Sequence, residues 1–211
     1  MALKGKKILI TCGPTWVAID SMRVISNRST GEMGHLLAKA LNALKAKVTL
    51  LEGPVTHSFK PGGVKVLKFC FFDELSALLN KELKNGYDCV IHAAAVSDFK
   101  PENTSNKKIK SDSRFSLKLV PLPKLIGKIK AAAPDVFLVG FKLENFLNNA
   151  SALRETKALF SKAKCDLVVA NFIKSGGYEG LLLDADKTLL GKAKNKTELV
   201  RLLVQNLRNN L

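Results

Sequence analysis

Residues 26–34, with the sequence SNRSTGEMG, have the composition of an anion-binding turn that leads into a helix. Ser29 and Thr30 carry hydroxyl groups suited to capping a helix that begins near residue 30, and apolar residues at helical spacing follow them. Several free backbone N–H groups and the positive end of the helix dipole then point at one place. The segment therefore predicts a site for a phosphate or a carboxylate group.

The elements around this turn alternate between short apolar runs and longer amphipathic stretches, which is typical of a parallel sheet with crossover helices. A strand at 7–11 precedes the turn, and a helix is expected at 30–46. Further strands are expected at 48–51, 64–69, 89–96, 116–120, 136–141, 166–171 and 180–184, and further helices at 73–84, 123–132, 150–162 and 197–208. We therefore predict one three-layer, Rossmann-like α/β domain over residues 1–211, with a mostly parallel sheet and helices on both faces.

Polar residues follow several of the predicted strands. They form four clusters, namely 13–15, 97–98, Lys142 with Glu144, and Asn171. Ligands of open α/β sheets bind where loops leave the carboxyl ends of the strands, so these clusters should converge in space.

The polar segment 101–114 is rich in lysine, asparagine and serine, and this composition predicts a mobile surface loop. Its Lys107, Lys108 and Lys110 would, on composition alone, be solvated loop lysines. A loop of this kind can also close over a ligand as a flexible lid.

The chain has 34 Lys and Arg residues against 18 Asp and Glu, a formal net charge of +16, which favours a polyanionic ligand. The basic residues are spread along the chain and the aromatic residues lie mostly in apolar runs, so a small anionic substrate is favoured over nucleic acid. The four cysteines are far apart and indicate neither a zinc site nor a disulfide framework. No signal-peptide pattern or apolar run of membrane-spanning length is present, so we expect a cytoplasmic protein that does not enter a membrane.

Short motifs in a fixed order along nearly the whole chain resemble those of the phosphopantothenate–cysteine ligase family, also called phosphopantothenoylcysteine synthetases. One such motif would be a weak signal, but the agreement in order and approximate spacing is strong. The matching positions are 13–15, 19–20, Arg23, 26–34, 94–98, 108–110, 140–144 and 170–171. In many bacteria the family's domain follows a flavin-dependent decarboxylase domain; that domain is absent from this sequence, so the resemblance implies a stand-alone ligase without flavin.

The resemblance implies a step of coenzyme A synthesis. A nucleoside triphosphate activates the carboxylate of 4′-phosphopantothenate as an acyl-nucleotidyl anhydride, with release of pyrophosphate, and the amine of cysteine then displaces the nucleotide to form an amide. We expect CTP, which bacterial members generally use, with ATP as the alternative, because residues 108–111 and 140–144 look more like the monofunctional and eukaryotic-type branches. Mg²⁺ is expected with the nucleotide, its protein ligands unassigned. Members of the family are typically homodimers with the active site near the interface.

By the same resemblance, Lys108 and Asn27 are the expected catalytic residues, Lys108 as a cation during activation and Asn27 in handling the intermediate. The expected substrate-binding residues are Asn27, Arg28, Ser29, Thr30 and Gly31. The expected nucleotide-binding residues are Gly13, Ala94, Asp98, Lys108, Pro123, Lys124, Leu125, Ile126, Phe141 and Lys157. Structural roles stay open for several of them: Asn27 as a cap or turn residue, Asp98 as a cap and Phe141 as a core residue. Arg28, like Arg23, could equally pair with the substrate phosphate or lie on the surface.

Two other function classes stay open. A nicotinamide-dependent oxidoreductase would share the early strand, turn and helix, but no GxGxxG follows the first strand, and Tyr87 and Tyr178 have no lysine four residues later. A basic module that binds nucleotides or nucleic acid would explain the charge and would bind polynucleotides in a salt-sensitive manner.

Overall fold

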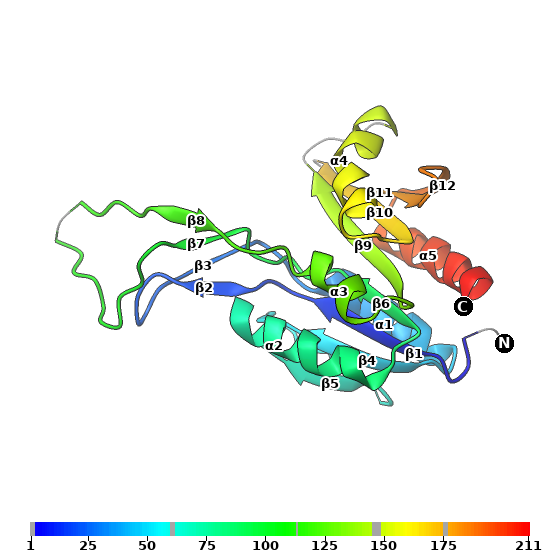
Figure 1. Ribbon diagram of the computed structural model, residues 1–211, viewed down its shortest axis with the longest axis horizontal. Helices are drawn as coiled ribbons and strands as arrows, with labels where there is room; N and C mark the ends of the chain where they lie inside the picture. Colours follow the sequence, from blue (N-terminus) through cyan, green and yellow to red (C-terminus); the bar gives the residue numbers. More distant parts are fainter. Residues whose placement is uncertain (1–2, 60–61, 113, 145–148, 175–176) are drawn as a thin grey trace.

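An eight-stranded sheet forms the centre of the computed structural model, which describes residues 3–59, 62–112, 114–144, 149–174 and 177–211 (Figure 1). The strands lie in the spatial order β12 (Leu189–Ala193), β11 (Gly177–Asp184), β10 (Leu167–Lys174), β9 (Phe137–Glu144), β6 (Cys89–His92), β1 (Lys7–Cys12), β4 (Lys47–Glu52) and β5 (Lys65–Lys68). Six neighbouring strands of this sheet, β10, β9, β6, β1, β4 and β5, run parallel. The strands β11 and β12 are antiparallel additions at one edge. The predicted mostly parallel sheet is confirmed.

Helices cover both faces of this sheet. Along β1, Ile8 and Ile10 point to one face and Leu9 to the other, because side chains alternate along a strand. Apolar residues of α1 (Glu32–Ala43) and α5 (Lys196–Asn210) pack on the Ile8 face. The Leu9 face is covered by α2 (Phe72–Glu82), a following 3-10 turn (Leu83–Asn85), α3 (Ile126–Ala132) and α4 (Asn149–Ser161).

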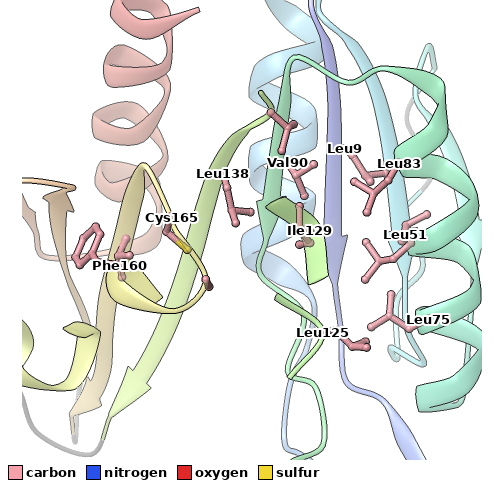
Figure 2. Close-up of a cluster of buried hydrophobic side chains, with 14 of the residues drawn as sticks. Leu9, Leu51, Leu75, Leu83, Val90, Leu125, Ile129, Leu138, Phe160 and Cys165 are labelled. Carbon is pink, nitrogen blue, oxygen red and sulfur yellow. The ribbon is translucent and has the colours of Figure 1, made fainter. Parts of the chain in front are cut away.

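The core on the Leu9 face illustrates how the layers interlock. Figure 2 shows Leu9 and Leu51 of the sheet beside Leu75 of α2 and Leu83 of the 3-10 turn that follows it. All four side chains are at most 5% exposed. Burial of apolar area on both faces holds the strands in register and so fixes where their carboxyl ends lie.

The strand order reverses direction between β1 and β6. The chain passes from β1 outward to β4 and β5, and then returns to the other side of β1 to build β6, β9 and β10. Loops that leave adjacent strands at such a reversal diverge to opposite sides and leave a crevice between them. The predicted sites in 13–15 and 94–98 leave β1 and β6 at this point.

Two small antiparallel sheets extend from the carboxyl edge of the large sheet and form an arm (Figure 1). The arm comprises residues 16–26, with β2 (Trp16–Ala18) and β3 (Val24–Ser26), and residues 99–121 apart from residue 113, with β7 (Phe99–Pro101) and β8 (Leu119–Pro121). The strands β2, β3 and β7 were not predicted, and β8 begins three residues later than predicted, because strands of three residues are too short for a period of two to be recognised. The strand β12 was also not predicted, while the lysine-rich segment was correctly expected at the surface.

Two helices begin two or three residues later than predicted. α1 begins at Glu32 and not near Thr30, because Gly31, in a left-handed conformation with φ of 72°, ends the preceding loop. α3 begins at Ile126 and not at Pro123, since Leu125 is the residue that precedes its first turn. Both corrections lengthen the loops available for ligand contact.

Candidate active site

The loops after β1 and β6 are joined directly to each other. Pro14 pairs with Ala95 in a short parallel bridge, and the Ala95 N–H donates to the Gly13 carbonyl at 2.9 Å. Thr15 Oγ1 donates to Ser97 Oγ at 3.0 Å and accepts from the Ser97 N–H at 2.9 Å, and both side chains are buried. Two of the four predicted polar clusters therefore converge.

A buried histidine orders the backbone at the end of β6. Thr11 Oγ1 accepts from the Ala94 N–H at 3.2 Å and lies 3.0 Å from His92 Nδ1. A hydroxyl that accepts from Ala94 can still donate its proton to His92, which requires a neutral imidazole with an unprotonated Nδ1. Burial lowers the pKa of His92 from 6.5 to about 4, which agrees with this arrangement.

We expect this histidine to make folding stability depend on pH. Because the folded-state pKa lies below the ordinary value, its contribution is fully present above pH 6.5 and is lost as the pH falls toward 4. The loss should total about 3 kcal/mol. Urea unfolding at pH 7.5 and pH 4.5 measures it, and His92→Gln should show a correspondingly smaller difference between the two pH values; an identical difference in both proteins would contradict the prediction.

Glycines allow the first turn and the helix entry to approach each other. Gly13 and Gly31 both have positive φ angles, of 77° and 72°. A Cβ on Gly31 would lie 2.8 Å from Val55 Cγ1, and one on Gly13 would lie 3.0 Å from the same atom. Larger residues are therefore excluded at both positions, and the backbone itself lines this part of the site.

The predicted substrate segment 27–31 lies beside the loop after β6. Asn27 Nδ2 donates to the carbonyl oxygens of Ala95 at 3.3 Å and Val96 at 3.0 Å. Ser29 Oγ accepts from the Gly31 N–H, and Thr30 Oγ1 accepts from the Glu32 N–H, each at 3.4 Å. These hydroxyls make long hydrogen bonds at the helix entry, while Asn27 fixes the segment to the loop after β6. Arg28 is exposed.

His35 and Glu52, which were not predicted as site residues, form a contact close to Gly31. His35 Nε2 lies 2.8 Å from Glu52 Oε1, which also accepts from the Phe59 N–H at 2.8 Å. Glu52 is 1% exposed, and its Oε2 has no hydrogen-bond partner among the described residues. The contact joins α1 to the end of β4, and no sequence pattern links two such residues seventeen positions apart.

Four of the predicted nucleotide-binding residues are Asp98, in the loop after β6, and residues 123–125, just before α3. Asp98 and Lys124 form an ion pair at the surface. Asp98 directly follows Ser97, so the pair lies next to the Thr15–Ser97 contact. Leu125 is 3% exposed and belongs to the core, so its side chain serves packing. Pro123 is exposed just before Lys124.

The remaining predicted contacts come from β9 and the elements beside it. Ile126 packs against the core, and a Cβ on Gly140 would lie 3.0 Å from its Cδ1. Phe141 is half-buried against the cluster of α1 and α5, and Lys142 pairs with Glu144 at 2.9 Å. Lys157 is exposed on α4, and Asn171 lies on β10 opposite Leu143 and Gly180.

Lys108 is not brought together with these residues. It belongs to the segment between β7 and β8, which lies at the end of the arm furthest from the large sheet (Figure 1). Its side chain is exposed. The N–H of the neighbouring Ile109 donates to the carboxylate of Asp20. This hydrogen bond is the largest cause that lowers the pKa of Asp20 to about 2.

Neither a metal cage nor a membrane segment is formed by the described residues. No three of their His, Cys, Asp or Glu side chains are grouped so that they could hold a metal ion. None of the helices in the described part of the chain is long and apolar enough to cross a membrane.

Comparisons with known proteins agree on one family. Residues 3–208 match the family described as the DNA/pantothenate metabolism flavoprotein C-terminal domain. The coenzyme A biosynthesis bifunctional protein CoaBC of Thermococcus kodakarensis is 39% identical over 180 residues, which cover 84% of this chain and 44% of that protein. The chain thus spans about half the length of the curated relatives it matches.

Solved structures show the same fold. The DNA/pantothenate metabolism flavoprotein from Streptococcus pneumoniae superposes with a TM-score of 0.88 and 25% identity, covering 98% of this chain and 100% of that one. A Cab2 variant in complex with phosphopantothenate-cysteine superposes with a TM-score of 0.80 and 18% identity, covering 97% and 87% of the two chains. At 18% identity the second likeness concerns the fold.

Proposed function

Because this chain belongs to the family of the DNA/pantothenate metabolism flavoprotein C-terminal domain, we propose that it joins 4′-phosphopantothenate to L-cysteine, using a nucleoside triphosphate. The observation that carries the proposal is the junction of residues 13–15, 27–31 and 94–98 at the reversal of strand order, in a chain 39% identical to a coenzyme A biosynthesis protein. The net charge of +16 favours the approach of two polyanionic substrates.

The proposed reaction has two steps. A carboxylate oxygen of phosphopantothenate attacks the α-phosphorus of the nucleotide, and the bond to pyrophosphate breaks. The amine of cysteine then attacks the acyl carbon, the nucleoside monophosphate leaves with the bonding electrons, and the amine loses a proton. Neither step transfers electrons to or from a redox cofactor, so the proposal requires no flavin.

The residues of the chain suit the binding of these anions. The helix entry at Gly31 presents the positive end of the α1 dipole, which favours a phosphate, and Arg28 is exposed nearby. Asn27 can hold the intermediate by accepting, at its amide oxygen, from a hydroxyl or N–H group of that intermediate, because its Nδ2 is committed to two carbonyl oxygens. Lys108 supplies a cation during activation. Mg²⁺ bound to the triphosphate would supply positive charge beside the leaving pyrophosphate.

Pyrophosphate release tests the proposal. The protein is assayed with 4′-phosphopantothenate, cysteine and Mg²⁺, in parallel with CTP and with ATP, and with phosphopantothenate omitted as the control. We expect release that requires phosphopantothenate, faster with CTP. Release with ATP but not with CTP would show that the predicted nucleotide is wrong. No release with either nucleotide from folded protein would contradict the proposed ligase activity.

We also propose a homodimer, located in the cytoplasm, where the reduced thiols of Cys12, Cys89 and Cys165 are stable. The arm supports the dimer, because it exposes large apolar side chains at Phe99 (53%) and Phe115 (55%). Large apolar side chains exposed on an extension of the fold are typical of an interface between subunits.

Phe115→Ser is therefore expected to weaken the dimer. The substitution occurs twice in a symmetric interface and removes about 3 kcal/mol of apolar burial in total, which raises the dissociation constant roughly 100-fold. Sedimentation velocity over a range of concentrations measures the effect. Ile173→Ser is the matched control, because Ile173 is 65% exposed but lies on β10, outside the arm. Equal dissociation constants for the two variants would exclude the arm as the interface.

A further inference from the structure

One buried carboxylate, that of Asp20, organises the end of the arm. Asp20 lies in the turn between β2 and β3 and is 4% exposed. Its Oδ1 accepts from the N–H groups of Met22 and Arg23, each at 2.8 Å. Its Oδ2 accepts from Arg23 Nη1 at 2.5 Å and from the Ile109 N–H at 3.0 Å. One oxygen therefore closes the local turn, and the other binds a segment 89 residues away.

Two further contacts hold the same segment. Arg23 Nη1 also donates to the Ile109 carbonyl at 3.1 Å, so both polar groups of the Ile109 backbone are bound. The Ser105 N–H donates to the Ile19 carbonyl at 3.2 Å. These bonds lie on either side of Lys108 in the sequence, whereas the Lys108 side chain itself is exposed. The backbone at Lys108 is thereby fixed while its ammonium group is left to reach a ligand.

We propose that Asp20 is a positioning residue for Lys108. With Arg23, it fastens the segment 105–109 to the turn between β2 and β3, so that Lys108 moves together with β2 and β3 and not as part of a free loop. The proposal rests on the proposed function, because it assigns a purpose to the placement of Lys108. Arg23 Nη1 accordingly binds Asp20 and Ile109.

The two oxygens of Asp20 make a selective test available. In Asp20→Asn the remaining carbonyl oxygen can still accept from Met22 and Arg23, so the local turn is kept. The new amide group would face the Ile109 N–H and the Arg23 guanidinium, which are donors, and so can accept from neither. The substitution should release the Lys108 segment without unfolding the sheet.

Two measurements on the full chain follow. Native-state digestion with trypsin should cut after Lys107, Lys108 and Lys110 at least tenfold faster in Asp20→Asn than in the unsubstituted protein, because tethered backbone resists proteolysis. In the pyrophosphate assay, kcat should fall at least tenfold while KM for phosphopantothenate changes less than threefold. Asp112→Asn, the same change at an exposed carboxylate of this segment, is the control and should alter neither value.

The outcomes separate the tether from the reaction. Unchanged cleavage in Asp20→Asn would overturn the tether, and faster cleavage with unchanged kcat would overturn the positioning role. Absence of pyrophosphate release from the unsubstituted protein would instead refute the proposed function, and cleavage would still report on the tether. If Asp20→Asn fails to fold, Arg23→Met replaces it, because the thioether side chain of methionine can donate to neither Asp20 Oδ2 nor the Ile109 carbonyl. Faster cleavage with a lower kcat is again expected, and no change in either would overturn the proposal.

Discussion

Lys108→Gln is expected to lower the rate of pyrophosphate release by about 100- to 1,000-fold, the usual effect of removing one group that stabilises charge developing in a transition state. In the proposed activation step, a carboxylate approaches a phosphate, and an uncharged amide cannot offset their repulsion. The Lys108 side chain is exposed and outside the core, so thermal unfolding should be unchanged. Lys107→Gln, which removes the neighbouring charge, should lose less than threefold. A normal rate in Lys108→Gln would remove this residue from the mechanism.

Mixed dimers show which subunit's site Lys108 serves. If Lys108 acts on the partner's site, equal amounts of Lys108→Gln and Asn27→Asp protomers should recover about a quarter of the normal activity, since half of the dimers are mixed and each has one intact site. If it acts within its own subunit, mixing should recover nothing.

Asn27→Asp is expected to abolish formation of the amide product, with a fall of at least 100-fold in cysteine-dependent turnover. The substitution replaces the Nδ2 that donates to the Ala95 and Val96 carbonyls with a charged oxygen that is repelled by both carbonyls and by the anionic intermediate. The segment 27–31 would then detach from the loop after β6.

Single-turnover assays with labelled phosphopantothenate distinguish the two steps in this variant. We expect the acyl-nucleotide to accumulate, or to be lost to water, while the amide forms slowly. Asn210→Asp makes the same change at the exposed end of α5 and should leave both steps intact. Normal amide formation in Asn27→Asp would show that this side chain has only a structural role.

Much of the large sheet could be predicted from the sequence, because its signals are local. Residues such as Ile8, Leu9 and Ile10 fill both faces of a buried strand, and the helices that follow carry apolar residues at helical spacing. The convergence of residues 13–15 with 97–98 also followed from a general rule for parallel sheets.

The arm and its contacts could not be predicted, because they depend on residues far apart in the chain. Three-residue strands carry too little periodicity, and the bond from Ile109 to Asp20 joins positions 89 residues apart. The same limit applies to His35 and Glu52. The start of α1 differs from the prediction for another reason. Ser29 and Thr30 have the residue types of helix caps, but the loop continues to Gly31, which has a left-handed conformation.

The arm is assembled from two separate parts of the chain, residues 16–26 and the hairpin of β7 and β8, and this arrangement constrains how it can change. An appendage encoded by one insertion can be shortened, exchanged between homologues or deleted as a cassette. Here, Asp20 and Arg23 lie in one half and bind the backbone N–H and carbonyl of Ile109 in the other, so the two halves hold each other in place. A graft of residues 16–26 should therefore be tolerated only when it keeps an aspartate at position 20 and an arginine at position 23.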